Sequence, residues 1–231
     1  KPDRRQRQMC IRDRFHWEPL RREGIDGFAG CIGSAPPSWI AQTSADQVVL
    51  DGPDAGEVIR YFGLDQDLAA IHDSFPREDE VLEEAMAYCP GIRLARQPLW
   101  ECLATFITSS LKQVAHIRAI SLTLRRSYGI EYQLNGKSFY TYPSPEVMQS
   151  VGEDNLRKCA LGYRAKSLDL AAKAIASGEI NLSAVEKELS ECDARVELTR
   201  LHGVGEKIAN CALLFGTGRW GAFPIDIWIE R

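Results

Sequence analysis

The stretch Leu201-His202-Gly203-Val204-Gly205-Glu206-Lys207-Ile208-Ala209-Asn210-Cys211 decides the fold of this chain. Its two glycines enclose one valine, between a helix expected to end near Leu201 and another expected to begin near Gly205. Backbone N–H groups at the start of a helix have no helical partners, so they can bind an anion together with the positive helix end. The alternative is an ordinary corner in which glycine only terminates the first helix. The stretch predicts two helices joined by a tight turn with an anion site.

Lys207 lies in the first turn of the expected second helix, where the positive helix end disfavours an ammonium group. A neutral amine is the form that attacks an electrophilic carbon, so this placement predicts a nucleophile. The alternative is a solvated surface lysine, which is the commonest state of lysine on a helix. Cys211 follows four residues later on the same helical face. The expected buried stripe of this helix consists of Ile208, Ala212 and Leu213.

A second chemical group follows in Phe223-Pro224-Ile225-Asp226-Ile227-Trp228. Proline followed by Asp226 predicts the start of a new helix, whose positive end keeps the carboxylate ionised. Taken alone, Asp226 would be an ordinary N-cap residue. A carboxylate and a reactive amine at neighbouring helix N-termini, beside an anion-binding turn, are a rarer combination. Together, Lys207 and Asp226 predict an active site that attacks a sugar carbon.

These motifs resemble a known family. Residues 201–211 resemble the helix-hairpin-helix of DNA glycosylases, with the pattern Leu-x-Gly-Val-Gly-x-Lys-x-Ala-x-Cys. Residues 222–226 resemble the Gly/Pro/Asp loop of these enzymes, with the pattern Ala-x-Pro-x-Asp. Both motifs are most similar to those of the 8-oxoguanine branch. The segment 97–110 is similar to the first catalytic-domain helix of the family, and 161–165 to its wedge segment. Phe15-His16-Trp17 and the short runs after it resemble the N-terminal sheet of this branch.

The rest of the chain predicts a mainly α fold. Short runs rich in glycine, proline and β-forming residues between 15 and 52 predict an antiparallel sheet. After residue 53, apolar residues recur at helical spacing. The later helices are expected at 98–110, 112–128, 145–150, 154–161, 165–177, 184–189 and 194–201. We therefore expect a helix-hairpin-helix DNA glycosylase fold with an N-terminal antiparallel β-sheet (α+β) subdomain.

Three regions are expected along the chain. Residues 1–14 read as a leader of doubtful origin, because they contain five arginines and no apolar periodicity. Residues 15–96 are expected to form a sheet-containing domain like that of the 8-oxoguanine glycosylases. Residues 97–231 are expected to form the helical catalytic domain, truncated at its C-terminus.

Composition limits where the protein can work and how it can bind. With 28 Lys and Arg against 32 Asp and Glu, the chain has no global basic field, so DNA binding must use a local face. Its seven cysteines are scattered, which predicts free thiols in a reducing compartment, most of them buried in the core. The sequence has no apolar run near the ~20 residues of a membrane helix. We expect a soluble intracellular protein, in the cytoplasm and nucleoid of a bacterium or the nucleus of a eukaryote, with no membrane partner.

The resemblance implies a role for each site residue. Lys207 would attack the sugar of a nucleotide flipped out of the duplex, while Asp226 would stabilise the positive charge that forms as the base leaves. The resulting Schiff base would permit β-elimination. Tyr163 would fill the gap in the duplex and Arg164 would contact the orphaned base. The alternative for Tyr163 is a core aromatic residue.

Further roles concern binding. The resemblance implies that Gly203, Val204 and Gly205 bind the DNA backbone and that Cys211 lines the base pocket. Backbone carbonyls of Thr199, Leu201 and Val204 would hold a structural monovalent or divalent cation. The chemistry would need no cofactor, and no iron–sulfur cluster is evident. His202 stands where the resemblance expects a proline.

The implied function is base-excision repair: a monomeric, bifunctional DNA N-glycosylase and abasic-site lyase that removes 8-oxoguanine from damaged double-stranded DNA. An alkylation-type glycosylase would lack the lysine and use water. An endonuclease III-like enzyme would have the lysine and also an iron–sulfur cluster. A non-catalytic DNA-binding hairpin would need Gly203 and Gly205 but not Lys207 together with Asp226.

Overall fold

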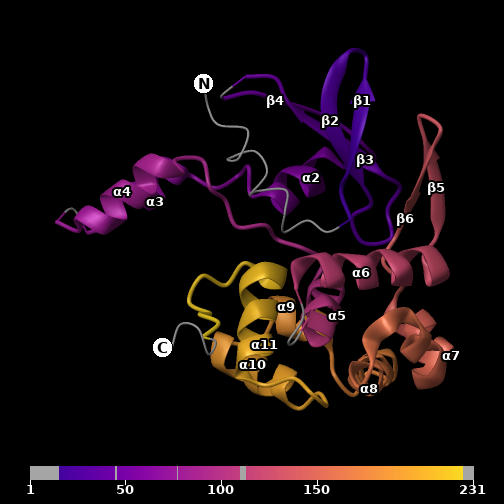
Figure 1. Ribbon diagram of the computed structural model, residues 1–231. Coiled ribbons are helices and arrows are strands. Elements are labelled where there is room, and N and C mark those ends of the chain that lie inside the picture. Colours follow the sequence, from indigo (N-terminus) through magenta and orange to yellow (C-terminus); the bar gives the residue numbers. More distant parts are fainter. Residues whose placement is uncertain (1–15, 45, 77, 110–112, 226–231) are drawn as a thin grey trace.

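The N-terminal part of the protein is a four-stranded antiparallel sheet that lies over a helical body (Figure 1). The computed structural model describes residues 16–225, apart from 45, 77 and 110–112. The strands follow the order of the chain: β1 (Glu18–Arg22), β2 (Ile25–Gly30), β3 (Ser38–Gln42) and β4 (Val48–Asp51). The predicted antiparallel sheet is therefore confirmed. The predicted leader at 1–14 lies outside the described residues.

One face of the sheet is covered by the helix α2 (Ala55–Phe62). The Asp54 side chain caps α2 by accepting from the backbone N–H of Glu57, and Gly63 ends it with a φ of 65°. Trp17, Tyr61 and Phe62 pack edge to face or tilted, with ring centroids 4.8–5.7 Å apart. This aromatic cluster fixes the sheet on α2.

A hairpin that the sequence analysis did not predict rises from the helical body beside this sheet (Figure 1). It consists of β5 (Glu131–Leu134) and β6 (Lys137–Tyr140), joined by Asn135 and Gly136 with φ angles of 49° and 73°. Positive φ at both turn residues is what the two-residue hairpin turn with an Asn-Gly sequence requires. Phe139 packs with Leu20 and Trp39 of the sheet, so the hairpin completes a cluster of the N-terminal part.

The helical body contains the predicted helices with shifted ends. They are α5 (Leu99–Ser109), α6 (Val114–Tyr128), α7 (Pro145–Leu156), α8 (Arg164–Ala176), α9 (Leu182–Lys187), α10 (Glu191–Thr199) and α11 (Glu206–Ala212). The two helices predicted at 145–150 and 154–161 are parts of α7 and of a π-helical turn, η1 (Arg157–Leu161), with a break at Gly152, where φ is 75°. A second π-helical turn, η2 (Leu213–Thr217), continues α11. The mainly α fold class is thus confirmed.

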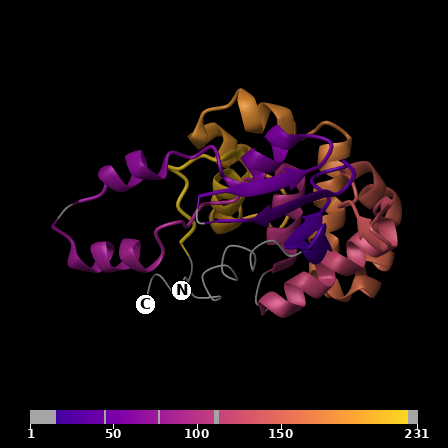
Figure 2. The same cartoon turned by 90° about the horizontal axis from the view of Figure 1, so that it is seen from above.

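Two short helices, α3 (Leu68–Asp73) and α4 (Glu80–Tyr88), form an arm that projects from the body (Figures 1 and 2). Neither helix has a buried residue. Each instead begins with an aspartate that caps its first N–H groups, Asp67 and Asp79. Within the part of the chain that the structure describes, no helix is long and apolar enough to span a membrane.

A buried ion pair lies where the sheet meets the helical body. Arg125 of α6 donates to Glu101 of α5, and its second terminal nitrogen donates to the Tyr140 carbonyl at 3.0 Å. His16 Nε2 donates to the Cys31 carbonyl at 2.8 Å, and its Nδ1 lies 3.4 Å from Glu101 Oε1. Burial raises the pKa of Glu101, although the guanidinium of Arg125 opposes this rise. The cluster joins both helices to the first residues of the sheet region.

Candidate functional site

The predicted hairpin joins α10 to α11. Gly203 has a φ of 80°, and the backbone N–H of Val204 donates to the Leu201 carbonyl at 3.0 Å to close the turn. Val204 is buried, which anchors the turn in the helical core. Gly205 is the N-cap residue of α11, and no side chain of the described residues caps this helix. A helix start without a side-chain cap is the kind of helix end at which an anion can bind.

Lys207 is exposed in the first turn of α11. The opposite face of the helix is buried through Ile208, Ala212 and Leu213, as predicted. The buried stripe fixes the orientation of α11, because the three residues belong to the main core cluster. The lysine side chain consequently lies on the outer face of the helix, beside the hairpin turn.

The hairpin rests on α8. A Cβ atom added at Gly203 would lie 2.5 Å from Ser167 Oγ, so only glycine fits there. The same hydroxyl lies 3.2 Å from Nδ1 of His202, the residue that stands in place of a proline. Since α8 begins at Arg164, this contact links the hairpin to the predicted wedge.

We expect Gly203→Ala to lower the free energy of unfolding by about 1–3 kcal/mol, because alanine at this φ is strained and its Cβ meets Ser167. Urea denaturation of the purified protein measures this loss. Gly205→Ala is the matched control, because the φ of Gly205 is −97° and nothing lies within 4 Å of its added Cβ. Only the smaller loss from replacing glycine by alanine at an N-cap is expected there. Equal losses in the two variants would contradict the close packing of the hairpin on α8.

The predicted wedge residue points away from the core. Ala160 and Gly162 both have φ near 60°, so the backbone reverses just before Tyr163. The Tyr163 side chain is 60% exposed, which makes the core-aromatic alternative wrong. The Arg164 guanidinium carbon lies 4.7 Å from the Tyr163 ring centroid, a cation–π distance. The two predicted wedge residues therefore form one stacked pair at the start of α8.

The cysteines largely follow the prediction. Cys31, Cys102, Cys159 and Cys211 are buried, and none of the six described cysteines forms a disulfide. Cys192 is exposed, which corrects the expectation of burial for that residue, because it lies on the outer face of α10. Cys102 Sγ lies 3.9 Å from the Cys211 carbonyl, and burial raises the pKa of the Cys102 thiol well above its usual range.

The candidate cation site consists of backbone carbonyls only. Thr199 is the last residue of α10, and Leu201 and Val204 belong to the turn that follows. The Leu201 carbonyl accepts one hydrogen bond there, which leaves a second lone pair. Among the described residues, no group of three His, Cys, Asp or Glu side chains lies close enough together to hold a metal ion.

The segment before the second predicted catalytic residue is described as far as Ile225. Asp226 itself lies outside the described residues, as does Trp228. Asn210 of α11 donates from Nδ2 to the Phe223 carbonyl at 3.3 Å. No role for Asn210 follows from the sequence motifs. Its position three residues after Lys207, on the same helix, is the signal that could have drawn attention to it.

Known proteins that are similar to this chain belong to the family that its sequence motifs resemble. Residues 7–103 match the family described as the N-terminal domain of 8-oxoguanine DNA glycosylase. A probable N-glycosylase/DNA lyase of Methanothermobacter thermautotrophicus is 32% identical over 175 residues, which cover 67% of this chain and 55% of that protein. The solved structure of MBOgg1 in complex with a low-affinity DNA ligand is 32% identical, with a TM-score of 0.84 over 94% of this chain and 74% of that one.

A second solved structure extends the likeness over nearly the whole chain. The Clostridium acetobutylicum 8-oxoguanine glycosylase/lyase, in complex with double-stranded DNA containing cytosine opposite 8-oxoguanine, is 27% identical. Its TM-score is 0.84, and the match covers 99% of this chain and 77% of that one. The fold and the hairpin thus define a protein of the helix-hairpin-helix class found in DNA glycosylases. Within this class, the chain belongs to the 8-oxoguanine DNA glycosylase family. It spans about half the length of the curated relatives it matches.

Proposed function

We propose that this protein is a base-excision repair enzyme that removes 8-oxoguanine from double-stranded DNA and then cleaves the abasic strand by β-elimination. The observation that carries this proposal is the exposed Lys207 in the first turn after a Gly-Val-Gly hairpin, in a member of the 8-oxoguanine glycosylase family. The enzyme acts as a monomer inside the cell, in the nucleoid of a bacterium or the nucleus of a eukaryote.

DNA binding uses the local face that the hairpin and the wedge share. The hairpin backbone at Gly203, Val204 and Gly205 binds a backbone phosphate, which needs no global positive charge. The Val204 N–H closes the turn, so it holds the hairpin in shape rather than donating to the phosphate. Tyr163 enters the duplex where the damaged nucleotide has been flipped out, and Arg164 contacts the orphaned base. The 60% exposure of Tyr163 and its stacking on Arg164 support this assignment.

The chemistry takes place at the anomeric carbon of the flipped nucleotide. Asp226 stabilises the positive charge that develops as the base leaves with the electron pair of the glycosidic bond. The neutral amine of Lys207 forms a bond to that carbon and loses its protons as the sugar ring opens to a Schiff base. Removal of a proton from the 2′ carbon then expels the 3′ phosphate. Cys211, which is buried and lies one helical turn after Lys207, lines the base pocket.

The chemistry itself needs no cofactor. We also propose that the backbone carbonyls of Thr199, Leu201 and Val204 hold a structural monovalent or divalent cation. The free lone pair of the Leu201 carbonyl supports this site. A cation held by these carbonyls would neutralise part of the charge of a phosphate bound at the hairpin.

Borohydride trapping on defined duplexes tests the function. Reduction of the Schiff base links the protein covalently to DNA, so a linked product requires an amine that has attacked the sugar. We expect trapping on duplexes containing 8-oxoguanine or an abasic site, and none on a duplex containing an alkylated purine. Trapping on none of the duplexes would contradict the proposal. Release of the alkylated purine without trapping would then favour the alkylation-type alternative, and no release of any base would favour the non-catalytic one.

Asp226→Asn is expected to slow base excision by at least about a hundredfold, because the neutral amide stabilises the developing positive charge less well. Its affinity for damaged duplex should stay nearly unchanged, since the carboxylate is not needed to bind the backbone. Single-turnover kinetics measure the first effect and fluorescence anisotropy measures the second. A large loss of affinity would show that Asp226 contributes to binding rather than to charge stabilisation.

A further inference from the structure

The loop 219–225, which leads from η2 to Asp226, is anchored at several points. The Arg219 guanidinium donates to the carbonyls of Val185 and Leu189, each at 2.8 Å. Ala222 is buried in the main core cluster. The Phe223 carbonyl accepts from Asn210, on the helix that carries Lys207. The chain therefore approaches Asp226 from fixed positions rather than through an unattached loop.

The side chain of Asn210 is itself held in one orientation. Its Oδ1 accepts from Nε of Arg195 at 2.7 Å, and Arg195 also pairs with Glu191 Oε1 at 2.8 Å. An arginine can only donate, so it selects the oxygen of the amide and leaves the NH₂ group to face the loop. The NH₂ group meets the Phe223 carbonyl there. The orientation of Asn210 on α11 is thus set by two residues of α10.

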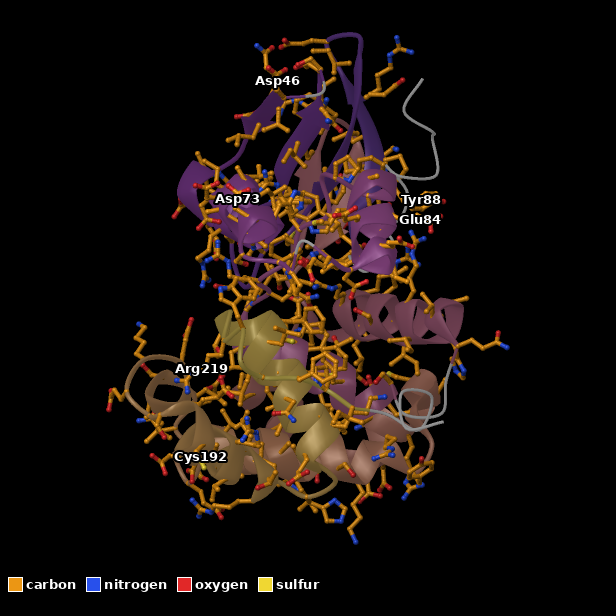
Figure 3. All side chains as sticks on the ribbon, turned by 90° about the vertical axis from the view of Figure 1, so that its left-hand side faces the viewer. Asp46, Asp73, Glu84, Tyr88, Cys192 and Arg219 are labelled. Carbon is orange, nitrogen blue, oxygen red and sulfur yellow. The ribbon has the colours of Figure 1, made fainter. Side chains whose placement is uncertain are left out.

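The same network meets the loop at a second point. A Cβ atom added at Gly221 would lie 2.7 Å from Oε2 of Glu191, so the loop backbone passes directly against this carboxylate. Figure 3 labels Arg219 on the loop and Cys192 in the first turn of α10, on the same side of the helical body. The loop is thus connected to α10 at Gly221, which lies against Glu191, and to α11 at Phe223, whose carbonyl accepts from Asn210.

We propose that Asn210, oriented by Arg195 and Glu191, is a positioning residue that sets the distance between Asp226 and Lys207. The inference rests on the proposed function, because it assumes that both groups act at one sugar carbon. Lys207 precedes Asn210 by three residues on α11, and Asp226 follows Phe223 by three residues. One hydrogen bond therefore connects the two catalytic segments, and misplacement by about 1 Å is enough to cost a catalytic site on the order of a hundredfold in rate.

Asn210→Ala should lower single-turnover excision of 8-oxoguanine about tenfold, the size expected for one hydrogen bond. Cleavage of a preformed abasic site should fall less than threefold, because the base has already left and Asp226 has no charge to stabilise there. In an Asp226→Asn background, Asn210→Ala should cause no further loss of excision, because the positioned carboxylate is already gone. Amide hydrogen exchange should become faster in 219–225 and stay unchanged in α8.

Asn155→Ala is the matched control. Asn155 has the same bonding pattern, since Oδ1 accepts from Lys158 at 2.8 Å and Nδ2 donates to the Val151 carbonyl at 3.0 Å. It lies on α7, away from the loop, so this variant should excise the base at the rate of the unsubstituted protein.

The outcomes separate the positioning role of Asn210 from the proposed function. If Asn210→Ala slowed excision equally in the protein with Asp226 and in the Asp226→Asn variant, the positioning role would be overturned while the proposed function stayed intact. If Asp226→Asn did not slow excision, or if no excision occurred at all, the proposed function would fail first. Hydrogen exchange decides the inference even then, because unchanged exchange in 219–225 of Asn210→Ala would show that Asn210 does not hold the loop.

Discussion

Lys207→Gln is expected to abolish borohydride trapping of the protein on duplexes containing 8-oxoguanine or an abasic site. Glutamine keeps the approximate length and polarity of the side chain but has no amine that can form a Schiff base. Strand cleavage by β-elimination should disappear with the trapped product, and base excision should fall on the order of a thousandfold or more. Gel electrophoresis of the reduced mixture measures the covalent product.

Lys187→Gln is the matched control for this experiment, because Lys187 is also an exposed helical lysine but lies in the last turn of α9. The control variant should be trapped as well as the unsubstituted protein. Trapping that survives in Lys207→Gln would show that another amine attacks the sugar, and the assignment of the nucleophile would then be wrong.

Arg125→Leu is expected to lower the free energy of unfolding by about 3–5 kcal/mol, because it leaves the Glu101 carboxyl buried without its charged partner. Both side chains are at most 5% exposed, so water cannot replace the lost contact. Urea denaturation followed by circular dichroism measures the change.

The double variant Arg125→Leu with Glu101→Leu separates the charge from the packing. Replacing both partners of a buried ion pair with apolar residues typically costs far less than removing one partner. The double variant should therefore be more stable than Arg125→Leu alone. A double variant that is less stable than the single one would show that Glu101 is satisfied by His16 without Arg125.

The apolar pattern of the sequence predicts the positions of the helices well and their ends less well. The helices predicted at 184–189 and 194–201 begin earlier, at Leu182 and Glu191, because Asn181 and Ser190 cap them. Their side chains accept from backbone N–H groups three residues later, and this fixes the start of a helix independently of the apolar pattern. The apolar periodicity describes the buried face of a helix and not its first turn.

The hairpin of β5 and β6 was missed for a different reason. Its Asn135-Gly136 turn is a strong local signal, but the flanking strands are only four residues long. Strands this short are too brief to show a clear alternation of apolar and polar residues, and the sheet on which they pack lies far away in the sequence. The packing of Phe139 with Leu20 and Trp39 depends on contacts across a hundred residues or more, which a local pattern cannot show.

The hairpin motif gave a fuller prediction of the site. The turn conformation, the exposed Lys207 and the buried stripe of α11 all follow from residues within one short stretch. The network of Glu191, Arg195 and Asn210 could not be read from the sequence, because its members face one another only after α10 and α11 pack together. Asp226 remains a prediction.

The β5 and β6 hairpin also bears on how the molecule folds. The hydrophobic cluster of the N-terminal sheet is incomplete until Phe139 arrives from a segment synthesised more than ninety residues after β3. Loop closure of that length delays the contact, so the sheet reaches its final packing only after α5 and α6 of the helical body have been made. The sheet and the helices are therefore expected to gain and lose their structure in one cooperative transition, with the hairpin as the connection between them.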